Sequence, residues 1–235
     1  MKEYKKISII IPVYNELTTL NKILDKVESV KFPISKELIL VDDFSTDGTR
    51  DLLKKLEEKY KVVYHEKNKG KGAALRTGFR FATGDIITIQ DADMEYDPQE
   101  FLKLIKLILD GETQVVYGSR FIGTTFFSKD KWFLPSHYLG NKALSLTTSI
   151  LYFRKITDME TCYKMFTREV LSKLKLRSKR FDFEPEITAK IIKKGYKIKE
   201  VPIKYYPRSF KHGKKITWRD GIKALYYLLK YRLIN

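Results

Sequence analysis

The chain has 235 residues, of which 43% are hydrophobic and 32% charged, enough to bury the core of one large domain. Its single cysteine, Cys162, excludes an internal disulfide and a metal-binding cysteine cluster, and suits a reducing cytosol. Lysine and arginine number 46 against 29 aspartate and glutamate, a formal net charge of +17. Such a field attracts polyanions, meaning nucleic acid, an anionic membrane surface or phosphorylated substrates, and charge alone does not choose among them.

Membrane-spanning and secretory segments are not expected. No run reaches the roughly 18 uncharged apolar residues that a spanning helix needs. The nearest, 143–153, is shorter and carries several hydroxyl side chains. Residues 1–6 lead directly into a strand-like run, which predicts no signal peptide. We therefore expect a protein that meets a membrane only at its surface.

Strand-like apolar runs alternate with helical patterns through the first half of the chain. Strands are predicted at 7–13, 37–42, 62–65, 85–90 and 115–117, and helices at 17–30, 46–60, 72–82 and 98–109. This alternation indicates parallel strands joined by right-handed crossovers. The predicted fold class is therefore α/β, with a Rossmann-like, mostly parallel central sheet flanked by helices.

The character of the sequence changes after Arg120. Residues 123–135 are rich in aromatic side chains and are predicted to form a loop. Helices are predicted at 138–153 and at 184–194, the second ending at Gly195, and a strand at 197–206. Residues 217–232 are predicted to form a basic amphipathic helix.

Two of these helices carry apolar stripes that either contact a bilayer or pack on the core or on a second subunit. The stripes comprise Leu144, Leu146, Ile150, Leu151, Tyr152 and Phe153 in the first helix, and Ile222, Leu225, Tyr226, Leu228, Leu229 and Leu233 in the second, flanked by Arg219, Lys223, Lys230 and Arg232.

Closely spaced acids follow the apolar run 86–89. Side chains alternate along an extended chain, so Asp91 and Asp93 are expected to point the same way. Two carboxylates at the carboxyl end of a strand form a hard-oxygen site suited to Mg²⁺ or Mn²⁺. For an isolated Asp-x-Asp, a solvated acidic turn is the better interpretation, so the other motifs decide.

Two further strand ends carry polar residues. After the first strand, Pro12 stops the ladder, and Tyr14 and Glu16 could place a ring and an acceptor beside a bound base; an ordinary strand-to-helix turn is the alternative. After the second, Thr46 or Asp47 can cap the next helix, but capping does not require Asp42 and Asp43. Carboxylates there can accept hydrogen bonds from a base or ribose.

Glycines and lysines at 68–72 lie at a predicted helix amino terminus. Free N–H groups and the helix dipole favour an anion there. The spacing of a phosphate-binding P-loop, and its closing Lys-Ser/Thr, are missing. Alone, this segment indicates little about function.

These segments, in this order, resemble the family 2 glycosyltransferases, whose catalytic domain has the GT-A fold. The matching pieces are 12–16, 42–49, 68–72 and 91–93. Further pieces are similar to the branch that transfers sugars to polyprenyl phosphates, which includes dolichol-phosphate mannose synthase and the dolichol- or undecaprenyl-phosphate glucose synthases: 118–120, 157–164, 181–184, 200–203, 206–208, 213–216 and 218–221. Many relatives carry carboxyl-terminal transmembrane helices; this sequence ends without them, which leaves open how it attaches to a membrane.

The resemblance implies one GT-A domain over 1–235, with a nucleotide-sugar-binding half at 1–120 and an acceptor- and membrane-facing half at 121–235. It also implies individual roles. The base and ribose site would be lined by Pro12, Tyr14, Glu16 and Asp43, and the nucleotide-sugar site would also include Lys71 and Ala92. The metal and the diphosphate would be bound by Asp91 and Asp93, and Glu95 could join the metal site. Arg120 and Arg208 would meet phosphate groups, a task that suits a guanidinium fork, although either could instead pair with a surface acid.

The reaction so implied moves a hexose from a nucleoside-diphosphate sugar of the GDP-mannose or UDP-glucose type to a polyprenyl phosphate, with inversion and with Mg²⁺ or Mn²⁺. Because a lipid phosphate is already anionic, a strong general base is not obligatory. Glu184 and Glu186 are candidates on the acceptor side, and equally good candidates for helix-start carboxylates. The expected location is the cytoplasmic face of a membrane, with an anchoring partner or a second copy as further partners.

Three other functions stay open. A family 2 transferase with a saccharide or protein acceptor would need a catalytic base to deprotonate a hydroxyl. A nucleic-acid-binding protein is suggested by the pI near 9.6, but no helix-turn-helix, zinc-finger or RNA-recognition pattern supports it, and no nucleic acid partner is predicted. The third is a catalytically idle partner protein. The presence of Asp91, Asp93 and Arg120 argues against it.

Overall fold

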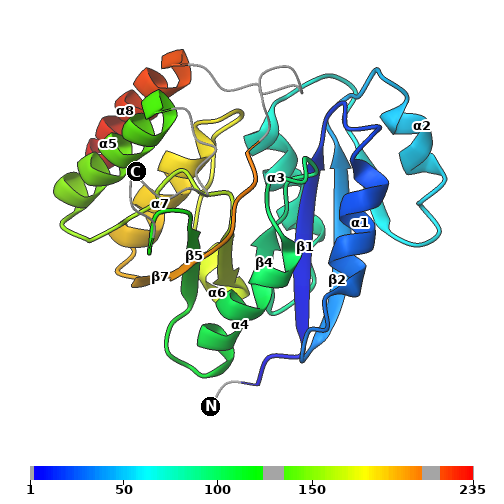
Figure 1. Ribbon diagram of the computed structural model, residues 1–235, viewed down its shortest axis with the longest axis horizontal. Coiled ribbons are helices and arrows are strands. Elements are labelled where there is room, and N and C mark those ends of the chain that lie inside the picture. Colours follow the sequence, from blue (N-terminus) through cyan, green and yellow to red (C-terminus); the bar gives the residue numbers. More distant parts are fainter. Residues whose placement is uncertain (1–2, 124–134, 208–217, 235) are drawn as a thin grey trace.

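A seven-stranded sheet forms the centre of the computed structural model, which describes residues 3–123, 135–207 and 218–234 (Figure 1). The strands are β1 (Lys6–Val13), β2 (Ser35–Asp42), β3 (Lys61–Tyr64), β4 (Ile86–Ile89), β5 (Val115–Ser119), β6 (Lys164–Thr167) and β7 (Ile198–Pro202). Their order across the sheet is β3-β2-β1-β4-β6-β5-β7. Only β6 runs antiparallel to its neighbours among these strands, β4 and β5, so the sheet is mostly parallel and the predicted α/β class is confirmed.

Helices cover both faces of the sheet and gather at one end of it (Figure 1). They are α1 (Leu20–Ser29), α2 (Thr49–Lys54), α3 (Lys71–Phe81), the 3₁₀ helix η1 (Pro98–Glu100), α4 (Phe101–Leu109), α5 (Pro135–Tyr152), α6 (Arg168–Ser172), α7 (Phe183–Lys193) and α8 (Trp218–Leu233). None of the helices in the described ranges is long and apolar enough to cross a membrane.

The sequence patterns missed β6 and α6 and overestimated some lengths. β6 has four residues, all buried, so it shows no alternation between faces. The helix predicted at 46–60 is only Thr49–Lys54, since Gly48 has a φ of +94° and starts it late. The strand predicted at 197–206 ends at Pro202. The helix stop at Gly195, with a φ of +83°, is confirmed.

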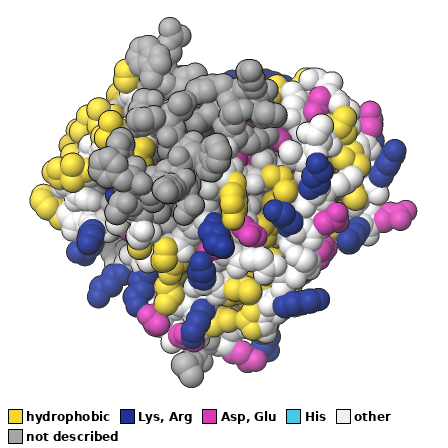
Figure 2. Space-filling model, viewed as in Figure 1, with side chains coloured by type: hydrophobic (Ala, Val, Ile, Leu, Met, Phe, Trp, Pro, Cys, Tyr) yellow, Lys and Arg dark blue, Asp and Glu magenta, His cyan; other side chains and the backbone are white. Residues whose placement is uncertain are grey.

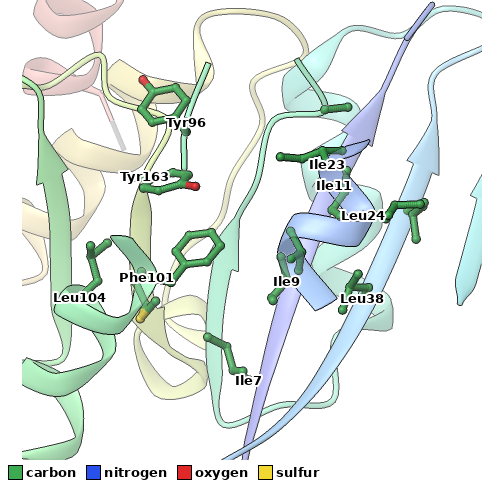
Figure 3. Packing of buried hydrophobic residues seen from close by; sticks show 14 of the residues in the cluster. Ile7, Ile9, Ile11, Ile23, Leu24, Leu38, Tyr96, Phe101, Leu104 and Tyr163 are labelled. Atoms are coloured by element: carbon green, nitrogen blue, oxygen red, sulfur yellow. The ribbon is translucent and has the colours of Figure 1, made fainter. Parts of the chain in front are cut away.

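One core cluster lies between the sheet and the helices α1 and α4. Strand residues such as Ile9 and Ile11 point toward Ile23 of α1 in Figure 3. The other side of this cluster is aromatic: the Tyr163 ring stacks between Tyr96 and Phe101, with centroid distances of 4.6 and 4.5 Å. These aromatic rings fill the space beneath the acidic segment that follows β4.

A second cluster packs α3 and α7 against the opposite face of the sheet. Gly78 of α3 is required there, because a Cβ at this position would lie 2.3 Å from Cγ2 of Ile10. A third cluster joins α5, α7 and α8 through Tyr152, Ala189, Leu228 and Tyr231. The two helices with predicted apolar stripes therefore pack on each other and on α7, each through part of its surface.

Candidate active site

One edge of the sheet collects the polar residues that the strands deliver. Because all described strands except β6 are parallel, their carboxyl ends meet at this edge, where ligands of open α/β sheets bind. Asp43, Asp91 and Arg120 follow β2, β4 and β5 there. The antiparallel β6 starts at the same edge, so the segment 158–163 before it lies among them.

Asp91 is half-buried at the centre of this edge and is bound by Lys71, at the start of α3. The Nζ of Lys71 lies 2.9 Å from Oδ1 and 3.0 Å from Oδ2 of Asp91. It also lies 3.0 Å from Sγ of Cys162 and 3.6 Å from Oε1 of Glu184. Burial opposes the ammonium charge, but Asp91, Cys162 and Glu184 together hold the pKa of Lys71 well above its usual value. Lys71 is therefore charged at any ordinary pH.

Asp93 and Glu95 shape the turn that follows. Met94 between them has a φ of +65°, and Oδ1 of Asp93 accepts a 3.1 Å hydrogen bond from the Glu95 N–H. The hydroxyl of Tyr205, beyond β7, donates a 2.5 Å hydrogen bond to Oε2 of Glu95. The turn is thus held from two sides.

The donor set suits a magnesium or manganese ion, but no group of three carboxylate, histidine or cysteine ligands converges on one point among the described residues. Mg²⁺ is commonly held by one or two carboxylates together with substrate phosphates and water. Asp91 and Asp93 therefore fit a metal that arrives with a diphosphate, and Glu95 is engaged with Tyr205.

Arg120 forms a two-pronged ion pair with Asp158. Its Nε and Nη2 donate to Oδ2 and Oδ1 at 2.7 and 2.8 Å, and its backbone N–H donates to Oδ2 at 2.9 Å. The guanidinium also lies 5.1 Å from the centroid of the Tyr205 ring. Burial opposes the charge, yet the pKa of Arg120 lies above its ordinary value because Asp158 is so close. Asp158 fixes where Arg120 can point.

Two carboxylates beside this pair have buried oxygens that accept no hydrogen bond within the described part of the chain: Oε1 of Glu160 and Oε2 of Glu184. Burial, with Glu184 nearby, raises the pKa of Glu160 to about 8. Burial lowers the pKa of neighbouring Lys164, whose ammonium donates to the carbonyls of Met159 and Thr161. Unpaired acceptors at the centre of the site are available to donors of a ligand.

The expected base and ribose site is organised by backbone contacts. Both oxygens of Asp43 are engaged: Oδ1 with the Lys69 N–H at 2.8 Å and with Nδ1 of His65 at 2.7 Å, and Oδ2 with the Gly70 N–H at 2.7 Å. Oε2 of Glu16 accepts a 2.7 Å hydrogen bond from the Thr19 hydroxyl. Asp43 thus holds the 68–70 loop in place, a task that the sequence did not reveal.

The remaining predicted residues divide into three groups. Pro12 and Tyr14 are half-buried on the same edge, and Ala92 is buried between the two aspartates. Glu186 lies away from the edge: its carboxylate accepts hydrogen bonds from the N–H groups of Arg177 and Ser178 and from Lys190, so its role toward an acceptor stays a prediction without geometric support. Arg208 lies outside the described residues.

Sequence reasoning assigned no role to several residues that the structure brings to the edge. These are His65, Asp158, Glu160, Lys164 and Tyr205. A signal existed for most of them, since 157–164 was among the segments that resemble the polyprenyl-phosphate branch. Only the antiparallel direction of β6 shows that this segment reaches Arg120.

Relatives among proteins of known sequence match nearly the whole chain, and two of them have names that state an activity. One is the dolichol-phosphate mannosyltransferase of Pyrococcus furiosus, 30% identical over 234 residues, 96% of this chain and 64% of the relative. The chain thus spans just under two thirds of that protein. The other is the UDP-N-acetylglucosamine–dolichyl-phosphate N-acetylglucosaminyltransferase of Methanococcus voltae, 29% identical, with 97% of each chain covered.

Among solved structures, glucosyl-3-phosphoglycerate synthase from Mycobacterium tuberculosis, in complex with Mn²⁺, UDP and glucosyl-3-phosphoglycerate, superposes with a TM-score of 0.73. The match covers 98% of this chain and 81% of that one at 20% identity. The same enzyme is also known with Mg²⁺ and UDP, at a TM-score of 0.69. The expected GT-A fold is thereby confirmed.

The sequence-family comparison covers the donor half and continues through β6 and α6. Residues 8–175 match the family described as glycosyl transferase family 2, well over half of the chain. This stretch contains every strand end from β1 to β5 and the segment that carries Asp158 and Glu160. The chain belongs to glycosyl transferase family 2.

Proposed function

We propose that the protein transfers a hexose from a nucleoside-diphosphate sugar to a polyprenyl phosphate, with inversion at the anomeric carbon and with Mg²⁺ or Mn²⁺ as cofactor. Two relatives that cover at least 96% of the chain carry names of enzymes acting on dolichol or dolichyl phosphate. The observation that carries the proposal is the meeting, at one sheet edge, of the Asp91–Lys71 pair with the buried cation Arg120.

The donor half of the edge supplies charge for a sugar diphosphate. A metal held by Asp91 and Asp93 would offset the negative charge that develops on the departing diphosphate. Lys71 holds its ammonium beside Asp91 and is charged at any ordinary pH, so it can contact the same phosphates. Gly70 and Gly72 let the backbone of this turn approach the 178–180 segment closely, and the turn is anchored by Asp43. The protein's contribution to the donor is positioning and charge.

The acceptor half supplies a second cation. Arg120 offers a planar, fixed guanidinium, and Asp158 occupies two of its N–H donors. A phosphate acceptor is anionic before it reacts, so the enzyme has to orient it rather than deprotonate it. Glu184, which lies 3.6 Å from Lys71, has a buried unpaired oxygen that can accept a hydrogen bond from a sugar hydroxyl.

The proposed site of action is the cytoplasmic face of a membrane, with α5 and α8 as the contact surface. Large apolar side chains stay exposed on both helices although other residues of the same helices are packed: Leu139, Leu146, Ile150 and Phe153 on α5 or directly after it, and Ile222, Leu225, Tyr226, Leu229 and Leu233 on α8. Figure 2 shows hydrophobic side chains gathered on the left edge, where Figure 1 places α5. Lys223, Lys230 and Arg232 accompany them, a combination that suits an anionic interface.

The test is transfer of radiolabelled sugar into an organic-extractable product. Purified protein in detergent receives Mn²⁺ or Mg²⁺ and polyprenyl phosphate, with GDP-mannose, UDP-glucose and UDP-N-acetylglucosamine in parallel. We expect lipid-phase label with one donor, lost in Asp91→Asn and Asp93→Asn and retained in the matched control Asp51→Asn, an exposed acid on α2. Label on a soluble acceptor such as phosphoglyceric acid, with none in the lipid phase, would overturn the polyprenyl-phosphate assignment.

Membrane contact is tested separately by vesicle flotation. Ile150→Glu and Leu229→Glu introduce a charge at two exposed apolar positions of α5 and α8, so we expect both variants to float less while melting normally. Phe81→Glu makes the same kind of change at an exposed position of α3 and should float like the wild-type protein. Equal flotation of all four proteins would contradict the proposed contact surface.

A further inference from the structure

A basic groove adjoins the donor edge at the 67–69 segment and extends away from it between α3, the segment 177–182 and α8. Its volume is about 1090 Å³, and ten lysine or arginine side chains line it against a single acid, Asp182. Among the lining residues are Arg76 and Arg80 of α3, and Lys230 of α8. None of Asp91, Asp93, Arg120 and Glu184 lines this groove.

The segment 177–180 presents its cations from a fixed backbone. Glu186 accepts hydrogen bonds from the N–H groups of Arg177 and Ser178, and Nη1 of Arg76 donates to their carbonyls at 3.0 and 3.3 Å. The Lys179 carbonyl accepts a 3.0 Å hydrogen bond from the Ala73 N–H. The loop therefore holds three cations, Arg177, Lys179 and Arg180, in a row beside α3.

This positive charge is only partly compensated in the described part of the chain: among the lining cations, Lys190 pairs with Glu186 at 2.6 Å. Arg80, Lys179 and Arg180 form no ion pair there, and Oδ1 of Asp182 is used by the Arg180 N–H at 2.8 Å. A fold that fixes like charges side by side stores repulsion that a bound anion relieves. Phosphate groups suit such a site, because each accepts several charge-assisted hydrogen bonds from arginine and lysine.

The shape of α8 indicates where these phosphates come from. Lys223, Tyr227 and Lys230 recur at i, i+4 and i+7 and line the groove. The exposed apolar residues Ile222, Tyr226 and Leu229 have the same spacing. Each directly precedes one of the groove residues in the sequence, so they lie on the adjoining face of the helix. The groove therefore borders the apolar contact surface, as headgroups border acyl chains in a bilayer.

Two of the three aromatic side chains that line the groove, Tyr227 and Tyr231, argue against bases of a nucleic acid. Tyr227 and Tyr231 stack on each other, with centroids 5.9 Å apart. Lys230 lies over the first ring and Lys190 over the second, at 5.6 and 5.2 Å. Since single-strand binding uses ring faces open to bases, these rings are already occupied.

We propose that this groove binds the phosphate groups of anionic lipid headgroups, as a site separate from the donor edge. It rests on the proposed contact of α5 and α8 with a membrane. Its consequence is that the protein selects anionic bilayers and is oriented on them by Arg177, Lys179 and Arg180.

The experiment compares two triple variants that each remove three positive charges. R177Q/K179Q/R180Q removes the three positive charges of the 177–180 segment. The control K22Q/K26Q/K55Q removes three exposed lysines, two on α1 and one directly after α2. Figure 1 places α1 and α2 at the opposite end of the molecule from α8. Flotation uses vesicles of phosphatidylcholine alone and of phosphatidylcholine with phosphatidylglycerol. Each basic residue near an anionic surface contributes on the order of fivefold, so the groove variant should bind anionic vesicles about 100-fold more weakly. The control should change little, since its charges lie beyond the screening length.

Equal loss in both variants, or no loss in either, would overturn the groove assignment. So would stabilisation by inorganic phosphate alone with unchanged vesicle binding, which would indicate a free-phosphate site. Retained vesicle binding with loss of affinity for a single-stranded oligonucleotide would indicate a nucleic acid. If the loop variant melts abnormally, K223Q/K230Q on the α8 wall replaces it.

Sugar transfer in detergent separates the two proposals. Lack of transfer in the wild type rejects the proposed function. Normal transfer by a wild type that binds neutral and anionic vesicles equally rejects only the groove.

Discussion

Lys71 and Asp91 form a half-buried ion pair in which the lysine ammonium contacts both carboxylate oxygens, at 2.9 and 3.0 Å. The carboxylate that would bind a divalent cation is thus already neutralised by the protein itself. Under the proposed function, a metal ion would have to share Asp91 with Lys71, and a diphosphate would favour that exchange because it can accept hydrogen bonds from the displaced ammonium. The pair would therefore couple metal binding to nucleotide binding.

Replacing Lys71 by methionine should separate these two events. Without the competing ammonium, Asp91 and Glu184 attract cations more strongly, so Mn²⁺ alone should bind about tenfold more tightly, equivalent to ~1.4 kcal/mol. A nucleoside diphosphate should bind more weakly, and sugar transfer should be lost. Titration calorimetry with Mn²⁺ in the presence and absence of UDP or GDP measures both effects. Lys55→Met is the control, because Lys55 is an exposed lysine directly after α2 and belongs neither to the predicted site nor to the basic groove. Unchanged Mn²⁺ affinity in the Lys71 variant would show that the ion pair does not compete with the metal.

The pair between Arg120 and Asp158 should matter for stability as well as for transfer. Asp158→Asn keeps the shape but leaves the buried guanidinium without its counter-charge, and breaking a buried pair from one side costs about 3 kcal/mol or more. Urea unfolding measures this loss of free energy. Asp110→Asn breaks the solvent-exposed pair with Lys106 and should leave the free energy of unfolding nearly unchanged. Similar losses in the two variants would mean that solvent reaches Arg120 freely.

The sequence allowed the α/β class and the donor edge to be predicted for a physical reason. Parallel strands buried on both faces are apolar throughout, so β1, β2 and β4 are visible as runs, and the polar residues after them mark one edge. The order of the strands then places the residues around Asp43 and Asp91 together. No long-range contact had to be known for this step.

The partners of those residues could not be predicted. Asp43 is predicted to meet a base or ribose, and the sequence did not reveal that its carboxylate also holds two backbone N–H groups of the 68–70 loop, the first of them 26 residues away. Arg120 finds Asp158 only because the short strand β6 runs antiparallel, and four buried residues carry no periodicity that reveals it. Glu186 looked like an acceptor-side acid, and its burial beneath the 177–180 segment is decided by tertiary packing.

Glu160 should make the stability of the protein fall as the pH rises. Burial, with Glu184 nearby, raises its pKa to about 8 in the folded protein, above the ordinary value of 4.5. Its contribution is therefore fully present below pH ~4.5 and is lost as the pH rises through ~8. Glu160→Gln removes the ionisation, so the variant should match the wild type near pH ~5 and exceed it by on the order of 2 kcal/mol near pH ~9. If the stability difference between Glu160→Gln and the wild type stays constant with pH, a group other than Glu160 causes the pH dependence.

Glu37 should have the opposite pH dependence, at the other end of the sheet. Burial alone would raise its pKa, but hydrogen bonds from Lys6, Ser8 and Thr83 outweigh it and lower the pKa to about 2. Its stabilising effect is thus present above pH ~4.5 and lost as the pH falls toward ~2. Glu37→Gln should cost about 1 kcal/mol at neutral pH, a modest figure because 21% of the side chain is exposed to screening solvent.

The measurement for Glu37 is chemical unfolding of wild type and variant between neutral and acid pH, with Glu57→Gln as control. The carboxylate of Glu57 accepts one exposed hydrogen bond, from Tyr64. Glu37, by contrast, accepts hydrogen bonds from the N–H groups of Thr83 and Gly84 and so ties β2 to the turn before β4. The unfolding free energies of the wild type and of Glu37→Gln should converge as the pH approaches ~2, since a protonated glutamate and a glutamine are then both neutral. A gap that persists in acid would show that the glutamine disturbs the packing of this corner and that the carboxylate charge is not what stabilises it.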